Sequence, residues 1–164
     1  MKSFVGWKNY YENKEEKSMK ILVINGPNLN FLGIREKGIY GSESYESLIA
    51  GLKAKAESDG IELECFQDNG EGPIIDRIQK AYHDKVDGII INPGAYAHYS
   101  IAIRDALASI EVPKIEVHIS NVYKREEFRH TSVITPVCTG EILGLGLQGY
   151  YLAMDAIKEI YKVK

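Results

Sequence analysis

The apolar run at residues 21–24 constrains the fold of this chain more than any other stretch. Consecutive aliphatic residues of this kind are typical of a strand covered on both faces in a parallel sheet. The run ends in the turn signal Asn25-Gly26-Pro27. Because ligands of open α/β sheets bind beyond the carboxyl ends of the strands, we expect the next loop to border a binding site. That loop carries an amide, a cation and a phenol, which are Asn28, Arg35 and Tyr40.

Strand and helix patterns alternate along the rest of the chain. Further strands are predicted at 61–66, 88–91, 115–119 and, briefly, at Val133 and Ile134. Helices are predicted after Ser42 or Ser44, from Pro73, across 101–110 and from about 144 to 161. Apolar spacing places Tyr82 on the side of the second of these helices that should cover the sheet, and the third contains Ile101. This alternation predicts an α/β fold, a flavodoxin-like three-layer sandwich with a central parallel sheet and helices on both faces.

Composition narrows the class of protein. A chain of 164 residues with net charge -3 is sized for one domain and lacks the basic footprint of a nucleic-acid binder. No apolar stretch approaches the roughly 20 residues that span a bilayer, so we expect no membrane insertion. The separated Cys65 and Cys138 favour a reducing, cytoplasmic location and a plain core role. Residues 1–18 are polar and are expected to form a disordered extension.

A period of two along 115–120 places Glu116, His118 and Ser120 on one face of the predicted strand. A carboxylate beside His118 favours the protonated ring and orients it, which suits a general acid. The alternative is a structural histidine hydrogen-bonded at a strand end. Polar residues also follow two other predicted strands, at Asn28 and at Asn92 with His98 nearby. We therefore expect these polar residues to lie together along one rim of the sheet, at the carboxyl ends of the strands.

The phenol of Tyr40, with an ordinary pKa of about 10, needs a cation to act as a base. Arg35, five residues earlier, is a candidate for that cation, and nearby glycines would let the loop close as a lid. A surface loop whose tyrosine packs on its own backbone explains the same spacing. Arg125 and Arg129 are candidates for contacts with substrate oxygens, or else belong to a solvated charge run.

Two further motifs are considered and set aside. Gly144, Gly146 and Gly149 match the dinucleotide pattern G-x-G-x-x-G, but we expect no strong strand before them and no acidic residue lies about 20 positions further on. Close packing of the last helix explains them better. The four histidines lack metal-ligand spacing, so we predict no metal.

Several ordered segments resemble the type II 3-dehydroquinate dehydratase family: INGPNLN, R-E-x-x-x-Y, NPGAYAH, IEVHISN, REEFR and GLGLQGY. The resemblance covers 19–164, which we expect to be a single catalytic domain. It implies a flavodoxin-like fold and cofactor-free dehydration of 3-dehydroquinate to 3-dehydroshikimate in the shikimate pathway. The reaction would be an anti elimination through an enolate. The resemblance also implies a homo-oligomer, a dodecamer built from trimers.

The resemblance assigns roles to individual residues. Tyr40 would remove the proton next to the ketone, and Arg35 would hold it as a phenolate. His118, oriented by Glu116, would protonate the departing hydroxyl. Asn28 would position His118 and a water that stabilises the enolate oxygen. The backbone amides of Ile119 and Ser120 would bind the substrate carboxylate. The substrate hydroxyls would be held by Asn92, His98 and Arg129. Asp105 would reach toward the site of a neighbouring subunit.

Some positions depart from the family pattern, namely Tyr99, Thr131, Cys138 and Glu141. We expect Tyr99 to add bulk beside His98 and to alter hydroxyl recognition or subunit contacts. Two other readings stay open. One is a flavodoxin-like protein that binds phosphate or flavin without chemistry. The other is an imine route to the same product, which needs a nucleophilic lysine, and Lys114 is expected at the opposite end of the sheet.

Overall fold

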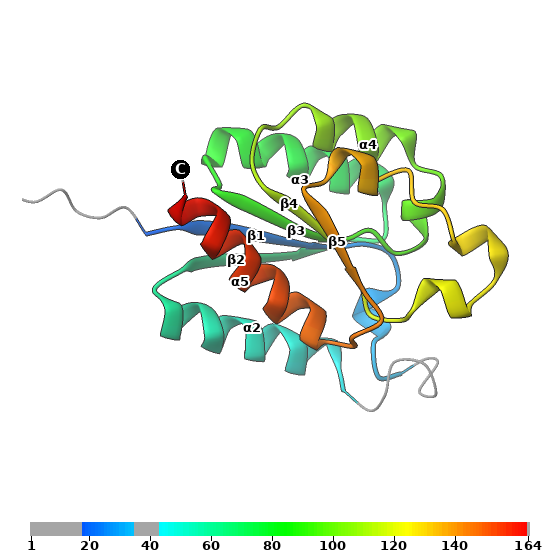
Figure 1. Cartoon of the computed structure of the whole chain (residues 1–164), viewed down its shortest axis with the longest axis horizontal. Helices are drawn as coiled ribbons and strands as arrows, with labels where there is room; N and C mark the ends of the chain where they lie inside the picture. The colour runs from blue at the N-terminus through cyan, green and yellow to red at the C-terminus, as the bar shows by residue number, and fades with distance from the viewer. Residues whose placement is uncertain (1–17, 35–42, 164) are drawn as a thin grey trace, which may run out of the picture.

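A computed structural model of the chain describes residues 18–34 and 43–163. Arg35, Tyr40 and nearly all of the expected N-terminal extension lie outside the described residues. Figure 1 shows a central sheet between two layers of helices. The five strands β1 (Lys20–Asn25), β2 (Glu62–Gln67), β3 (Gly88–Asn92), β4 (Lys114–His118) and β5 (Gly140–Leu143) are all parallel, in the order β2-β1-β3-β4-β5. This is the flavodoxin-like order, and the predicted fold class is confirmed.

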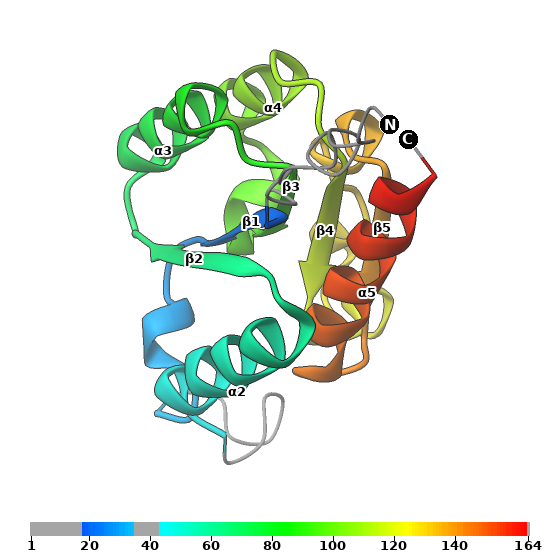
Figure 2. The same cartoon turned by 90° about the vertical axis from the view of Figure 1, so that its left-hand side faces the viewer.

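Four helices cover the two faces of the sheet (Figure 2). Helices α2 (Tyr45–Asp59) and α5 (Gln148–Lys162) lie on one face, and α3 (Glu71–Asp84) and α4 (Ile101–Ala108) lie on the other. Alternate residues of β1 explain this sandwich, because Ile21 and Val23 join the core under α2 and α5 whereas Leu22 and Ile24 join the other core. No helix within 18–34 and 43–163 is both long and apolar enough to cross a membrane.

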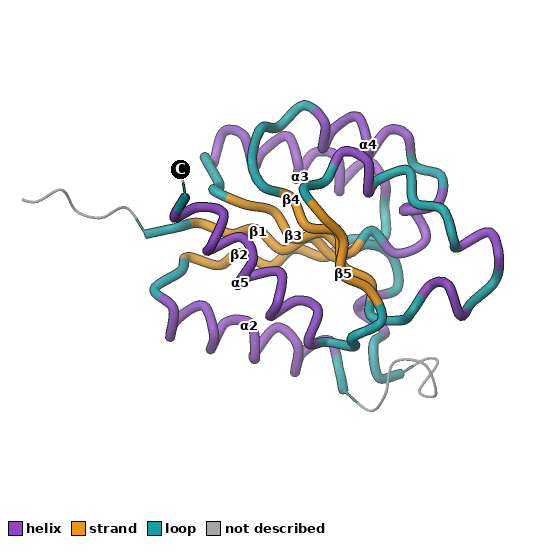
Figure 3. Tube along the Cα trace, viewed as in Figure 1, coloured by secondary structure: helices purple, strands orange, loops and turns teal. Residues whose placement is uncertain are grey.

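Short 3-10 turns lie in the connections that follow β1, β3 and β4 (Figure 3). They are η1 (Leu29–Phe31), η2 (Gly94–His98), η3 (Val122–Lys124), η4 (Glu127–Arg129) and η5 (Thr135–Val137). The buried residues of α2 are Leu48, Leu52 and Ala56, which lie on one face of the helix. Ser44 caps this helix by accepting a hydrogen bond from the N–H of Ser47 at 3.1 Å.

The predicted strand at Val133 and Ile134 is wrong. The last strand is β5, which begins at Gly140. Ile134 is fully buried in the core beside α3 and α4, and the Val133 N–H donates to the Ala97 carbonyl at 2.8 Å. Both residues therefore bury their apolar groups from a loop, whereas β5 is a short edge strand with too few apolar residues to stand out in the sequence.

Tyr82, predicted on the side of its helix that covers the sheet, is exposed, and so is Ile101 at the start of the next helix. Tyr82 is 68% exposed and Ile101 is 54% exposed. In α3 the buried stripe runs through Ile74, Arg77, Ile78 and Ala81, which rotates Tyr82 toward solvent. Ile101 is the first residue of α4, before that helix turns its apolar side to the sheet.

A strand does precede the glycine motif, because β5 ends at Leu143 directly before Gly144, but it is only the short edge strand of the sheet. Close packing nevertheless explains part of the motif. A Cβ atom on Gly149 would lie 3.3 Å from Val117 Cγ1 and 3.4 Å from Ile142 Cγ2. The absence of a side chain at Gly149 thus lets α5 approach β4 and β5 closely.

Candidate functional site

A cavity of about 220 Å³ opens at the carboxyl ends of β1, β3 and β4. The structure brings eight of the sequence-predicted site residues to its wall. These are Asn28, Asn92, His98, His118, Ile119, Ser120, Arg125 and Arg129. They come from the ends of three strands, β1, β3 and β4, and from the connections that follow them. They meet because these strands are parallel neighbours in the sheet.

The loops after β1 and β3 are pressed together at the cavity. The Gly26 N–H donates to the Asn92 carbonyl at 2.8 Å, and a Cβ atom on Gly26 would lie only 2.5 Å from the Pro93 carbonyl oxygen. Asn28 has a left-handed backbone with φ of 69°, a conformation that asparagine tolerates better than most residues. Its N–H donates to Asn69 Oδ1 at 3.0 Å. The backbone of this loop is therefore held in place on both sides of the cavity entrance.

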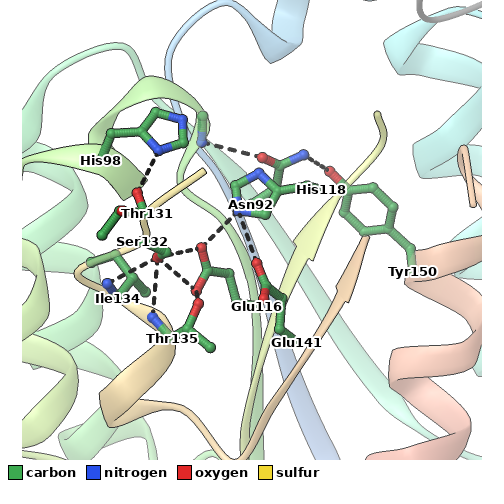
Figure 4. A network of polar contacts seen from close by, with 11 residues as sticks. Asn92, His98, Glu116, His118, Thr131, Ser132, Ile134, Thr135, Glu141 and Tyr150 are labelled. Carbon is green, nitrogen blue, oxygen red and sulfur yellow. Dashed lines mark hydrogen bonds and ion pairs between the residues drawn. The ribbon is translucent and has the colours of Figure 1, made fainter. Parts of the chain in front are cut away.

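Glu116 and His118 form a buried pair on β4 (Figure 4). His118 Nε2 lies 2.7 Å from Glu116 Oε1. Since a carboxylate oxygen accepts, Nε2 carries the proton of this bond. The other ring nitrogen, Nδ1, is then the atom that can exchange a proton with a ligand.

The Glu116 carboxylate is held by two hydroxyl groups from the connection before β5. Ser132 Oγ lies 2.9 Å from Oε1 and 3.1 Å from Oε2, and Thr135 Oγ1 donates to Oε2 at 2.6 Å. Ser132 Oγ in turn accepts from the N–H groups of Ile134 and Thr135. Sequence reasoning missed both hydroxyl residues, because they come from a loop that carries no strand or helix period.

His98 lies beside His118, with ring centroids 6.4 Å apart and planes 17° from parallel. Its Nδ1 donates to the Thr131 carbonyl at 2.9 Å. The carbonyl of residue 131 makes this bond, so the departure at Thr131 leaves it intact. Tyr99 is 63% exposed and is absent from the described walls of the cavity, so its bulk does not narrow them.

A buried chain of hydrogen bonds links α5 to the side-chain amides at the ends of β1 and β3, and we call it the buried amide chain. Tyr150 on α5 is fully buried, and its hydroxyl donates to Asn25 Oδ1 at 2.6 Å while accepting from Asn92 Nδ2 at 2.9 Å. Asn92 Oδ1 accepts from the Gly94 N–H at 3.2 Å. Figure 4 shows this link between α5 and the polar cluster. The orientation of the Asn92 amide is thereby fixed at both of its heteroatoms.

The charges on the described wall of the cavity are cationic. Arg125 and Arg129 line it together with two histidines, and no carboxylate does so within 18–34 and 43–163. Arg129 Nε donates to Glu126 Oε2 at 2.8 Å, so the charge run 125–129 is partly paired on its outer side. A cavity with this lining favours a small anionic ligand rich in oxygen atoms.

Comparison with known proteins decides the family. The model of the family described as Dehydroquinase class II matches residues 19–158. The chain belongs to the class II dehydroquinase family. It is 75% identical over 139 residues to the 3-dehydroquinate dehydratase of Lachnoclostridium phytofermentans, covering 85% of this chain and 96% of that protein. It is 64% identical over 143 residues to the enzyme of the same name from Lachnospira eligens, covering 87% and 97%.

A solved structure also resembles this chain closely. The type II dehydroquinase from Butyrivibrio crossotus has a TM-score of 0.85 and 64% identity, covering 86% of this chain and 98% of that one. The family resemblance inferred from the sequence motifs is confirmed.

Other residues singled out in this class II dehydroquinase chain lie away from the cavity. The Asp105 carboxylate is 69% exposed on α4, 3.7 Å from Arg104 Nη1. Lys114 begins β4 and is buried at the opposite end of the sheet, where its Nζ donates to the carbonyls of Ile110 and Val112. Burial lowers the pKa of Lys114. Arg35 and Tyr40 lie outside the described residues.

Three groups with possible metal-ligand atoms converge behind the cavity. Atoms of Glu116, His118 and Glu141 lie within 4.8 Å of one another. The hydrogen bonds from His118, Ser132 and Thr135 already occupy both oxygens of Glu116. These bonds account for the cluster within the described residues, and the absence of a metal stays a prediction.

Proposed function

We propose that this chain is a hydro-lyase that dehydrates 3-dehydroquinate to 3-dehydroshikimate. One observation carries the proposal. A buried carboxylate holds His118 by Nε2, and the ring lines a cationic cavity of a chain closely related to proteins named 3-dehydroquinate dehydratase. The substrate is a small hydroxylated carboxylate, which suits the two arginines and the amide groups on the wall.

The reaction divides into two proton transfers. Tyr40, held as a phenolate by Arg35, removes the proton from the carbon next to the ketone, and the electron pair forms an enolate. The enolate then collapses, the carbon–oxygen bond breaks on the opposite face, and the hydroxyl leaves as water with a proton from His118. Asn28, with a bound water, stabilises the enolate oxygen while its charge develops.

The geometry of His118 fits the role of acid. Glu116 accepts a hydrogen bond from Nε2, so Nδ1 is the ring nitrogen that delivers the proton. Ile119 and Ser120 supply backbone amides for the substrate carboxylate. Asn92, His98 and Arg129 hold the remaining oxygens. Neither transfer involves a cofactor.

An imine mechanism would need a lysine in the cavity. No lysine lines it within the described residues, and Lys114 lies at the far end of β4. The elimination through an enolate is therefore the better proposal. Treatment with borohydride in the presence of substrate tests this choice, because inactivation would indicate a covalent imine.

The proposal includes assembly into a dodecamer of trimers in the cytoplasm, with 19–164 as the single catalytic domain. Large apolar side chains are exposed around the cavity side of the molecule, including Tyr99, Ile101, Tyr123 and Phe128. Burial of such groups is a common basis for association. Light scattering on a sizing column gives the mass, and a monomer at assay concentration would contradict the assembly.

Ultraviolet absorbance tests the function directly, because the product is a conjugated enone and the substrate is not. We expect the absorbance to rise steadily after 3-dehydroquinate is added, and almost not at all with Tyr40→Phe. Tyr161→Phe removes a partly exposed hydroxyl near the end of α5 and is the matched control. A rise that survives Tyr40→Phe would remove the proposed base. A flat trace from the folded parent protein would favour the alternative, a flavodoxin-like protein that binds phosphate or flavin.

A further inference from the structure

Strand β5 brings a second carboxylate next to the Glu116–His118 pair. In the parallel register Glu116 is opposite Glu141, and Val117 is opposite Ile142. Because side chains alternate along strands, both carboxylates lie on the same face of the sheet. Glu141 Oε1 lies 3.9 Å from His118 Nε2, the same nitrogen that contacts Glu116 (Figure 4).

Glu141 also borders a second cavity, which shares His118 with the first. This cavity has a volume of about 270 Å³, and its walls include Glu141, His118, Thr135 and His130. The Glu141 side chain is 20% exposed, whereas that of Glu116 is fully buried. The two carboxylates are therefore not equivalent: one is sealed in hydrogen bonds and the other opens toward the second cavity.

The charges in this cluster act on the Glu141 carboxyl group. The pKa of Glu141 is raised, because burial and the nearby Glu116 carboxylate outweigh the opposing effect of His118. Two carboxylates this close repel one another unless a positive charge lies between them. The imidazolium form of His118 supplies that charge.

We propose that Glu141 is a positioning residue for the reaction, a second carboxylate partner that keeps His118 charged and its Nδ1 proton ready for delivery. The proposal rests on the role of His118 as the acid. It adds a residue on β5 to a pair that lies wholly on β4. Glu141 acts through His118 and does not touch the substrate cavity within the described residues.

Other charged groups face His118 from the elements packed around it. Glu116 lies on the same strand, and the His98 ring is stacked alongside from η2. Arg129 of η4 lines both cavities, and Arg125 lines the first. The arginines disfavour a charged His118, and a second carboxylate near the ring offsets their effect.

Two measurements on Glu141→Gln test the proposal. The first is the pH dependence of kcat/KM, in which the alkaline midpoint should fall by about one pH unit. The second is the NMR titration of the His118 ring proton without substrate, assigned with His118→Asn, which should shift in the same direction by a similar amount. Glu141→Asp keeps the charge and should restore most of both midpoints.

Glu62→Gln is the matched control, since it removes one carboxylate from β2, where Glu62 pairs with Lys20 at 3.1 Å. It should leave both midpoints in place. Superimposable titrations of Glu141→Gln and the parent protein would overturn the proposal. If Glu141→Gln does not fold, Glu141→Ser leaves room for water and should give the same shift.

The two measurements separate this inference from the proposed function. One informative result is an NMR titration that shifts in a protein that does not dehydrate 3-dehydroquinate. That result would support the effect of Glu141 on His118 and exclude the catalytic role of His118. An unshifted titration in an active enzyme would exclude the proposed role of Glu141 and leave the proposed function standing.

Discussion

Removing the hydroxyl of Tyr150 tests whether the buried amide chain is an energetic link between α5 and the cavity. Tyr150→Phe keeps the ring, which packs in the core under α2 and α5. It takes away the donor to Asn25 Oδ1 and the acceptor of Asn92 Nδ2, at 2.6 and 2.9 Å. Each partner lies at the end of a central strand and is buried.

The expected loss follows from those two partners. A buried polar group left without its hydrogen bond costs about 1–3 kcal/mol. Asn25 Nδ2 already lacks a partner among the described residues, so turning that amide brings no compensation. We therefore expect Tyr150→Phe to lower the free energy of unfolding by about 2–4 kcal/mol. The freed Asn92 amide should also raise KM more than it lowers kcat.

Alkaline pH supplies a second signature of the same hydroxyl. Burial raises the pKa of Tyr150 above that of an ordinary tyrosine, although the hydrogen bond from Asn92 opposes this. Above pH ~10 the unfolded chain loses this proton while the folded chain keeps it. The free energy of unfolding then falls by up to about 1.4 kcal/mol per pH unit, until the folded hydroxyl ionises as well. Tyr150→Phe should lack this contribution.

Urea unfolding at one fixed protein concentration measures both effects, because association also contributes to apparent stability. Tyr151→Phe is the matched control on the same helix, as its hydroxyl lies against Gly51 and away from the cavity. A loss below about 1 kcal/mol for Tyr150→Phe, or an equal loss for Tyr151→Phe, would refute the reasoning.

Three further predictions concern the backbone, the thiols and a helix cap. Gly26→Ala places a Cβ atom 2.5 Å from a backbone carbonyl oxygen, so urea unfolding should show that the free energy of unfolding falls by at least about 2 kcal/mol. Gly72→Ala has open space around it in α3 and should raise the free energy of unfolding by about 0.5–1 kcal/mol. Equal effects of the two substitutions would contradict this prediction. Burial raises the pKa of Cys65 to about 11 and of Cys138 to about 12, so alkylation at pH ~8 should be slow until the chain is unfolded. Ser100→Ala removes the cap of α4 and should cost about 1–2 kcal/mol in thermal unfolding, whereas an unchanged Tm would show that the cap contributes little.

The central elements could be predicted from the sequence because their signals are local. Residues 21–24 are buried on both faces, and a strand of that kind reads as an unbroken apolar run. The alternation at 115–120 correctly placed Glu116 and His118 on one face, because the period of a strand does not depend on its neighbours. The shared rim followed from the parallel order of the strands.

The features that sequence reasoning missed depend on contacts between distant segments. Strand β5 is recognisable only through its pairing with β4, and Glu141 gains significance only through that register. Ser132 and Thr135 contact Glu116 from a loop, so no helix or strand periodicity in the sequence predicts their contacts. Val133 and Ile134 have the composition of a strand, but tertiary packing buries them without one.

The bond from Tyr150 to Asn25 spans 125 positions of the chain, and this has a consequence for biosynthesis. A polypeptide emerges from the ribosome with its N-terminal segments first. Strands β1 and β3 are thus exposed long before α5 leaves the exit tunnel, and until then the amides of Asn25 and Asn92 lack the hydroxyl that orients them. A nascent chain therefore completes the floor of its cavity with its last helix, so truncated translation products carry an unfinished site.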